Sequence, residues 1–258
     1  MGTRPALRPR IARYLLASAL LVAAAPAGAQ APPAEQPIRL PPVLVTAPAR
    51  LPDAPLPLDH VPGSVEIISG QSIRESGAGN LQEYLTRLPG VTLNDEQGNS
   101  QQPDLSFRGF QATSVTGVPQ GISVFVDGVR VNEPTVEEVN FDLLPLDDIE
   151  HIEVIRGPTA LFGRNTLGGA LNIITRRGGA QREFEGGVEA GSFGRQKYSL
   201  RASGPAGPFD YYVSGSFFDE DGWRDLSPTR SEHGFVSASY RDAKDTADLS
   251  LIAANTSL

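Results

Sequence analysis

The chain has 258 residues and no cysteine, which excludes disulfides and thiolate metal sites. Acidic residues outnumber basic ones by 30 to 22, and the formal net charge of −8 argues against a nucleic-acid-binding protein. The three histidines, His60, His151 and His233, are scattered without ligand spacing, so we predict neither a metal site nor a cofactor.

Residues 1–29 are predicted to be a secretory signal peptide. A basic start is followed by the short apolar run Leu15–Ala25 and by the small-residue sequence Ala27-Gly28-Ala29, after which we expect cleavage. The apolar run is too short to span a bilayer as a helix, although a membrane anchor is the competing interpretation. The protein is therefore expected to be exported from the cytoplasm of a bacterium.

Residues 30–54 are predicted to be a flexible, proline-rich arm. Ten prolines between residues 30 and 62 disfavour helix and keep the chain extended. The segment 43–46, Val-Leu-Val-Thr, is a β-prone island within this arm. It is either a chance apolar cluster or an exposed strand that adds to the edge of a partner's sheet.

Residues 55–178 are predicted to form a small α+β domain with one clear helix. Asn80 can cap this helix, with Glu83 at the reciprocal capping-box position. Pro89-Gly90 ends it. Four residues at helical spacing form its apolar face: Leu81, Tyr84, Leu85 and Leu88. Short strands are expected at residues 65–68, 91–94, 105–108, 122–126, 129–132, 149–156 and 170–175.

The glycine-rich stretch 151–177 raises the question of a nucleotide site. A phosphate loop is excluded, because Phe162 stands where the second glycine belongs and Arg164-Asn165 supplies no Lys-Ser/Thr pair. We interpret the glycines as structural: Pro158 begins a short helical turn over 159–162, and the later glycines let the chain reverse. Adjacent carboxylates such as Asp147-Asp148 form no spaced acid–base pair, so we predict that the protein is not an enzyme.

Residues 179–258 change to an alternating pattern of about five strands. The alternation covers residues 183–190, 197–203, 210–218, 236–241 and 246–253. One face carries apolar, small and aromatic residues and the other carries polar residues, as is typical of outer-membrane barrel strands. A soluble antiparallel sheet with one wet face is the alternative. Five strands cannot close a bacterial barrel, so we expect an open, curved sheet beside the preceding domain.

Five motifs in order resemble those of TonB-dependent outer-membrane receptors. "PVLVTA" (42–47) resembles the TonB box, "LQEYLTRLPGV" (81–91) the plug helix and "LSFRGF" (105–110) the Arg-Gly motif of the plug. "VFVDGVRV" (124–131) resembles a plug strand, and residues 145–177 resemble the most characteristic plug block. The resemblance implies an α+β plug domain followed by the first strands of an incomplete, truncated antiparallel β-barrel. Complete members have roughly 22 strands around a plugged lumen.

The resemblance also implies roles for individual residues. Arg108 and Arg156 resemble plug arginines that latch the plug to acidic residues of the barrel wall. Polar loops at 95–103 and 111–121 place Gln101, Gln111 and Thr113 near the ligand. The TonB-binding strand would consist of Val43, Leu44, Val45, Thr46 and Ala47.

The implied function is energised uptake across the outer membrane of a Gram-negative bacterium. The implied partners are TonB, with ExbB and ExbD in the inner membrane, outer-membrane lipid and a small extracellular ligand. A ferric siderophore is the expected ligand, and cobalamin or a glycan is the alternative within the same class. A soluble periplasmic binding or adhesion protein is the alternative of another class.

Overall fold

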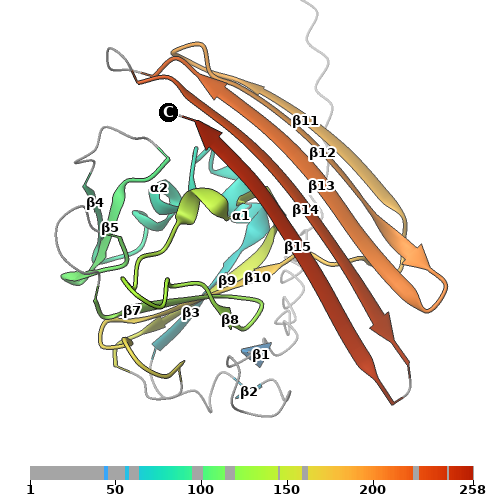
Figure 1. Ribbon diagram of the computed structural model, residues 1–258, viewed down its shortest axis with the longest axis horizontal. Helices are drawn as coiled ribbons and strands as arrows, with labels where there is room; N and C mark the ends of the chain where they lie inside the picture. The colour runs from blue at the N-terminus through green and yellow to red at the C-terminus, as the bar shows by residue number, and fades with distance from the viewer. Residues whose placement is uncertain are drawn as a thin grey trace, which may run out of the picture. The chain divides into compact units, whose positions relative to one another are not determined.

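The computed structural model describes residues 44–45, 56–57, 64–94, 101–113, 120–144, 146–158, 162–222, 227–242 and 244–257 (Figure 1). The chain divides into two compact units, 1–40 and 41–258, and every described residue belongs to the second. The predicted signal peptide and most of the proline-rich arm therefore lie outside the described residues. So do residues 95–100 and 114–119, in the two predicted ligand loops.

A mixed five-stranded sheet forms the centre of the N-terminal domain. One pair of neighbouring strands is parallel: β7 pairs with β10, with Val124 opposite Leu171. The other neighbouring strands pair antiparallel, namely β3 with β9, β9 with β10, and β7 with β8. The strand order is β3 (Ser64–Ser69), β9 (Ile149–Arg156), β10 (Gly169–Thr175), β7 (Ile122–Val126) and β8 (Val129–Arg130). All five residues of β7 are buried, as expected for a strand covered on both faces.

Two short helices cover this sheet. In α2 (Leu81–Leu85), the Asn80 Oδ1 atom accepts a hydrogen bond from the Glu83 amide at 2.7 Å, which confirms the predicted cap. The reciprocal bond differs, because the Glu83 carboxylate reaches one residue further back and accepts from the Gly79 amide. The helix ends at Leu85, and Leu88 is buried in the turn that follows. The helix α1 (Gly70–Glu75) was not predicted.

A small second sheet consists of β4 (Val91–Asn94), β5 (Asp104–Phe107) and β6 (Phe110–Gln111). Arg108 and Gly109 both have positive φ, 53° and 83°, and form the two-residue turn between β5 and β6. The strand predicted at 105–108 therefore ends at Phe107, and the strand predicted at 129–132 is shortened to β8 (Val129–Arg130). The second stops at Arg130 because the Asn132 side chain accepts from the Val124 amide and donates to the Ile122 carbonyl.

The core of the domain lies between the central sheet, the helices and the small sheet. Its largest fully buried side chains include Ile73, Leu85, Leu105, Ile149 and Ile152. Full burial of such a side chain contributes about 1.5–3 kcal/mol, so these residues hold the helices and sheets together. Two 3-10 helices, η2 (Phe141–Leu143) and η3 (Leu146–Asp148), lie between β8 and β9 in the chain.

The C-terminal strands form a separate antiparallel sheet in which each strand pairs with the next in the chain. Within the described residues β11 and β15 do not pair with each other, so the sheet is open, as predicted (Figure 1). The strands are β11 (Glu183–Ala190), β12 (Gln196–Ala206), β13 (Phe209–Glu220), β14 (Thr229–Arg241) and β15 (Thr246–Ser257). β14 begins seven residues before its predicted start at 236, because residues 229–235 pair with β13 although their alternation is weak.

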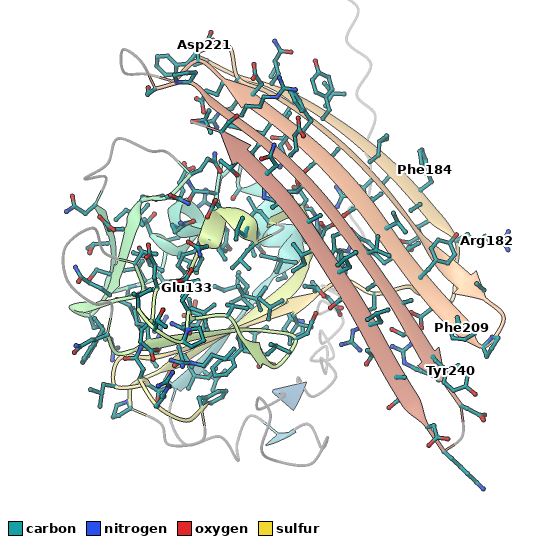
Figure 2. All side chains as sticks on the ribbon, viewed as in Figure 1. Glu133, Arg182, Phe184, Phe209, Asp221 and Tyr240 are labelled. Carbon is teal, nitrogen blue, oxygen red and sulfur yellow. The ribbon has the colours of Figure 1, made fainter. Side chains whose placement is uncertain are left out.

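The two faces of this sheet differ as the alternation predicted. Tyr212 and Phe235 are buried on one face, and their rings lie 5.9 Å apart. Apolar side chains on the other face are exposed, and Figure 2 shows Phe184 projecting from it. The exposed set includes Phe184, Val188, Leu200, Val213, Val236, Leu249 and Leu251. None of the helices in the described part of the chain is long and apolar enough to cross a membrane.

Candidate functional site

A polar seam joins the N-terminal domain to the C-terminal sheet. Lys197 of β12 donates from Nζ to the Asp147 Oδ1 atom at 2.8 Å, and both side chains are mostly buried. Tyr212 of β13 donates its hydroxyl to the Asp148 Oδ1 atom at 2.7 Å. The two neighbouring acids of η3 therefore bind two neighbouring strands of the sheet. We call these four residues, Asp147, Asp148, Lys197 and Tyr212, the η3 seam.

Asp148 is the most deeply placed acid of the seam, with 4% of its surface exposed. Burial raises the pKa of its carboxyl above the ordinary value of 3.8, and the hydrogen bond from Tyr212 opposes that rise. Its backbone carbonyl accepts from the Arg176 amide at 2.7 Å, and the Arg176 guanidinium lies over the Tyr212 ring. The end of β10 is thereby tied to the same point of the interface.

Two further contacts extend the seam. His233 of β14 donates from Nε2 to the Asp142 backbone carbonyl at 2.6 Å, which fixes η2 against the sheet. Ser237, also in β14, donates to the Arg176 carbonyl at 3.2 Å, and Arg177 pairs with Asp248 of β15 at 2.5 Å. Each of these described strands, from β12 to β15, therefore contributes a polar group to the interface.

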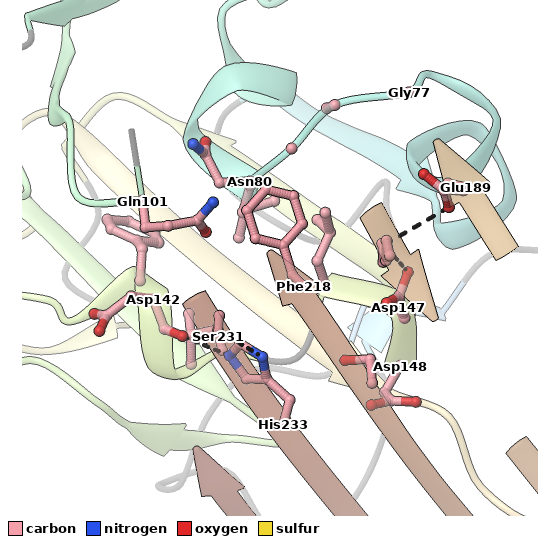
Figure 3. A pocket seen from close by; sticks show the side chains of 18 of the residues that line it. Gly77, Asn80, Gln101, Asp142, Asp147, Asp148, Glu189, Phe218, Ser231 and His233 are labelled. Atoms are coloured by element: carbon pink, nitrogen blue, oxygen red, sulfur yellow. Dashed lines mark hydrogen bonds and ion pairs between the residues drawn. The ribbon is translucent and has the colours of Figure 1, made fainter. Parts of the chain in front are cut away.

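A polar cavity of about 60 Å³ lies within the interface (Figure 3). The segment Gly77–Leu81 and the two 3-10 helices line one side, and Glu189, Arg195, Lys197 and His233 line the other. Sites for drug-sized ligands are typically about 300–1,000 Å³. The cavity has room for a few water molecules and is too small for a bulky ligand.

The glycine-rich stretch makes backbone contacts inside the N-terminal domain. The Gly157 amide donates to the Gly168 carbonyl at 3.0 Å, and the Gly168 amide donates to the Gly121 carbonyl at 2.7 Å. The Asn165 side chain accepts from the Gly121 amide at 2.5 Å. Amides used in this way cannot cradle a phosphate, which supports the structural interpretation. Residues 159–161, most of the predicted helical turn, lie outside the described residues.

The comparison with protein families accounts for this arrangement. Residues 57–170 match the sequence model of the TonB-dependent Receptor Plug Domain. The chain belongs to the TonB-dependent receptors. Its N-terminal domain is the plug, and β11 to β15 are antiparallel strands of the receptor barrel, in agreement with the predicted fold class.

Similar proteins of known name or structure support the assignment. The chain is 30% identical over 196 residues to "Vitamin B12 transporter BtuB" of Vibrio vulnificus (strain CMCP6), covering 72% of the chain and 31% of that protein. It resembles the siderophore receptor PirA of Pseudomonas aeruginosa, with 25% identity, a TM-score of 0.55 and coverage of 76% and 34%. For the ferripyoverdine receptor of the same species the identity is 19%, the TM-score 0.64 and the coverage 83% and 27%.

The match spans about a third of the curated relative's length, so the larger part of that receptor has no counterpart among these residues. The described plug and barrel strands correspond to the plug and a part of the barrel in the receptors of known structure. The activity, ligand and partners of the whole receptor accordingly belong to the proposals below.

The two predicted latch arginines lie in different parts of the plug. Arg108 sits in the β5–β6 turn with its guanidinium 5.5 Å from the centre of the Phe107 ring. Arg156 pairs with Glu66 of the neighbouring strand β3, inside the plug. No ion pair joins either arginine to β11–β15 in the described part of the chain. A latch to other parts of a barrel wall stays a prediction.

The three predicted ligand-binding residues of the receptor are not in one cluster. Gln101 is buried and lines the cavity of the seam, whereas Gln111 is exposed on β6. The Thr113 hydroxyl accepts from the Leu105 amide at 2.8 Å and donates to the Pro103 carbonyl at 3.3 Å. These bonds give Thr113 a structural role in the plug, and a direct ligand contact stays a prediction for all three.

The predicted TonB box is described at two of its five positions. Leu44–Val45 forms β1, which pairs antiparallel with β2 (Leu56–Pro57). Val43, Thr46 and Ala47 lie outside the described residues. The pairing agrees with the β-prone character of the island, and TonB binding by this segment stays a prediction.

Sequence reasoning missed the η3 seam. Asp147-Asp148 is only a pair of adjacent carboxylates in the sequence, and Lys197 and Tyr212 fall within two of the alternating segments. A usable signal was present, because Lys197 and Tyr212 occupy positions that alternate with the exposed apolar residues of their strands and therefore face the plug.

Proposed function

We propose that this protein is an outer-membrane receptor that takes up a small, scarce ligand with energy supplied through TonB. The observation that carries the proposal is a plug bound through a polar seam to one face of a sheet whose other face is apolar and exposed. That combination suits strands with lipid on the outside and a plug in the lumen. Transport by this arrangement requires no catalytic residue.

The seam suits a plug that must be held at rest and moved during transport. The contacts of the seam are hydrogen bonds and ion pairs. Each such contact contributes about 0.5–1.5 kcal/mol to stability. An apolar interface of the same extent would resist separation in water more strongly. A force applied to the arm at Val43 to Ala47 would therefore separate plug from wall in small steps.

TonB would apply that force by strand addition to the arm. The segment Leu44–Val45 already adopts strand conformation, and an extended segment can add to the edge of a partner's sheet through backbone hydrogen bonds. We also propose that Arg108 and Arg156 contribute to holding the plug through acids of the barrel wall. A double-mutant cycle between each arginine and the wall carboxylates would measure that coupling.

A ferric siderophore is the ligand that we propose first. The siderophore receptor PirA and the ferripyoverdine receptor share the fold of this chain. Cobalamin is the second candidate, because the curated relative with 30% identity is a vitamin B12 transporter. Both ligands are metal complexes, and the two are separated by direct uptake measurements.

The test uses cells that lack the gene and cells complemented with it. Complementation should restore uptake of iron-55 presented as a siderophore complex, and it should leave cobalt-57 cobalamin uptake unchanged. The opposite result would replace the first ligand by the second, and restoration of neither would reject both. Fractionation should place the intact protein in the detergent-extracted outer membrane, with an N-terminus that begins at Gln30.

The role of the arm is tested by two deletions of equal length. Deletion of residues 43–47 should abolish uptake and TonB cross-linking, whereas deletion of residues 50–54 in the same proline-rich arm should preserve both. Ligand binding to intact cells should survive either deletion, because the plug and barrel are untouched. Uptake that persists after removal of 43–47 would reject the TonB box.

A further inference from the structure

Within the described part of the chain, one buried glutamine of the plug makes no side-chain hydrogen bond. Gln82 lies in α2 with 1% of its surface exposed, and neither its amide oxygen nor its amide nitrogen is bonded within the described part of the chain. Buried amides are almost always satisfied by protein or by a bound group, because the uncompensated loss of water is costly. Something absent from the polypeptide is therefore expected beside Gln82.

The Gln82 side chain lines a small polar cavity of about 10 Å³, enough for one particle of the size of a water molecule. The cavity lies between α2, the start of β5 and the segment that precedes η2. Its other polar walls are Gln102, Asp104, Thr113, Glu138 and Asn140. None of the described residues that line it is basic.

The surroundings of the cavity are acidic. Asp104 is buried, with 7% of its surface exposed, and Glu138 is half-buried. Glu133 and Asp142 place further negative charge near Glu138. A water molecule would satisfy only the amide of Gln82, whereas a cation would also be attracted by the carboxylates that line the cavity.

We propose that this cavity binds a single calcium ion through the oxygens of Gln82, Asp104 and Glu138. Carboxylate and amide oxygens are the ligands that Ca²⁺ prefers, and its coordination geometry is flexible enough for an irregular set. Asn140 and Thr113 bring further oxygens to the wall of the cavity. Among the described residues, no group of three or more His, Cys, Asp and Glu side chains could hold a metal ion. The proposed site therefore depends on the amide oxygen of Gln82 in addition to the two carboxylates.

The ion would join three parts of the plug that are distant in sequence. Gln82 belongs to α2, Asp104 to β5 and Glu138 to the loop before η2. Residues 101–103 and 113 belong to the two polar loops predicted to carry ligand contacts, and Asp104 follows the first of them. Calcium would therefore stabilise the plug beside these loops, independently of which ligand the receptor transports.

Calorimetry on the intact protein in detergent tests the site. After dialysis against a chelator, titration with CaCl₂ should show one ion bound per chain and a rise in the thermal unfolding midpoint. MgCl₂ should bind at least about tenfold more weakly, because Mg²⁺ demands near-ideal octahedral geometry and gives up its water reluctantly. Absence of calcium binding to the wild-type protein would overturn the proposal.

Variants locate the ion. Gln82→Leu and Asp104→Asn should each weaken calcium binding at least about tenfold, and Glu138→Gln, at a less buried wall, provides a variant with little risk of misfolding. Gln71→Leu and Glu75→Gln are matched controls, since both residues are on α1 and bond to each other in an exposed position. These controls should bind calcium as the wild type does.

The outcome for Gln82→Leu separates an ion from a water molecule. If water alone fills the cavity, this variant will shift the thermal midpoint equally with and without calcium, and the proposal is wrong. Equal calcium affinity in the wild type and in Gln82→Leu, Asp104→Asn and Glu138→Gln would also reject it, because the ion would then be bound elsewhere. Near-ultraviolet circular dichroism confirms that each compared variant is folded.

Discussion

The plug sheet and the sheet β11–β15 each contain five strands, yet their side chains are buried in opposite ways. In the plug, β7 is buried at every position, its neighbour β10 is nearly so, and most of β9 is buried. In the second sheet, aromatic residues such as Tyr212 and Phe235 are buried beside polar ones, while a band of apolar residues is exposed. The plug follows the rule for a protein in water, whereas the second sheet follows the rule for a strand between lipid and a plugged lumen.

A single exposed valine has a different meaning in the two sheets. Val129 on β8 of the plug is 68% exposed and belongs to a two-residue edge strand. Val213 on β13 is 42% exposed and lies in register with Ala202 and Val236, so the apolar surface continues across strands. Continuity across strands, and not exposure alone, distinguishes the surface that we propose meets lipid.

The largest expected effect is a cavity in the plug core. Ile152→Ala removes a fully buried side chain in β9 and should lower the free energy of unfolding of the plug by about 2–5 kcal/mol. Hydrogen–deuterium exchange of β9 and β3 in the detergent-purified protein measures this loss. Ile152→Val is the matched control and should cost about 0.5–1.5 kcal/mol. Equal exchange in both variants would show that β9 is not part of a cooperative core.

The next effect tests the difference between the two valines. Val213→Arg should destabilise the folded receptor in lipid vesicles by about 2–4 kcal/mol, because a charge on the lipid face near the middle of the bilayer is costly. Val129→Arg should change stability by less than about 0.5 kcal/mol, because that side chain faces water. Urea titration of folding in vesicles compares the two. Similar values for both would reject the assignment of β11–β15 to the membrane.

The boundary between the regions should respond to pH through Asp148. Burial raises the pKa of this carboxyl, so the folded state holds its proton more tightly than the unfolded state does. Stability from this group is therefore greatest below about pH 4 and falls as pH rises through the raised pKa. Asp148→Asn should remove that fall, and its stability relative to the wild type should improve between pH 3 and pH 7.

Tyr212→Phe is the complement of that experiment. It removes the hydroxyl that donates to Asp148 and leaves a buried carboxylate without this donor, at an expected cost of about 1–3 kcal/mol at pH 7. The cost should decrease at pH 3, where the carboxyl is protonated. Unfolding midpoints in urea at the two pH values measure both variants. A cost that is independent of pH would mean that the hydroxyl acts through packing alone.

Local patterns were sufficient to predict most strands of both sheets. β9 carries apolar residues at Ile149, Ile152, Val154 and Ile155, and β10 is mostly apolar. β11–β13 and β15 alternate with period two, so these strands can be recognised without their neighbours in space. The helix α1 was missed because it has a single fully buried apolar anchor, Ile73, and is held by its contact with β9. The first half of β14 was missed because Ser231 and His233 alternate with polar residues, and pairing with β13 makes it a strand.

The contacts of the interface are harder to predict than the elements that carry them. The strand alternation indicates that Lys197 and Tyr212 face inward, but their partners lie 50 and 64 residues earlier in the chain. No spacing rule connects an acid in a 3-10 helix to a lumen-facing strand. The residues that line the cavity at Gln82 cannot be grouped from the sequence either, because amide and carboxylate ligands have no characteristic spacing outside known loops.

The smallest expected effect compares an ion pair in the seam with one at the surface. Asp147→Asn breaks the ion pair between Asp147 and Lys197, whose two side chains are mostly buried. This substitution should lower the free energy of unfolding by about 1 kcal/mol. Loss of the neighbouring charge also makes Asp148 easier to ionise, which offsets a part of that cost. Glu232→Gln removes the same kind of charge from the exposed pair with Arg230 and should cost less than about 0.5 kcal/mol.

Salt distinguishes the two pairs further. Raising the ionic strength from 0.1 to 1 M shortens the Debye length from about 10 Å to about 3 Å and screens exposed pairs most strongly. The small effect of Glu232→Gln should therefore disappear in 1 M NaCl, while that of Asp147→Asn should persist, as judged by urea unfolding midpoints. If both effects vanished together, the seam would be as open to solvent as the outer surface, and the plug would have no protected polar attachment at η3.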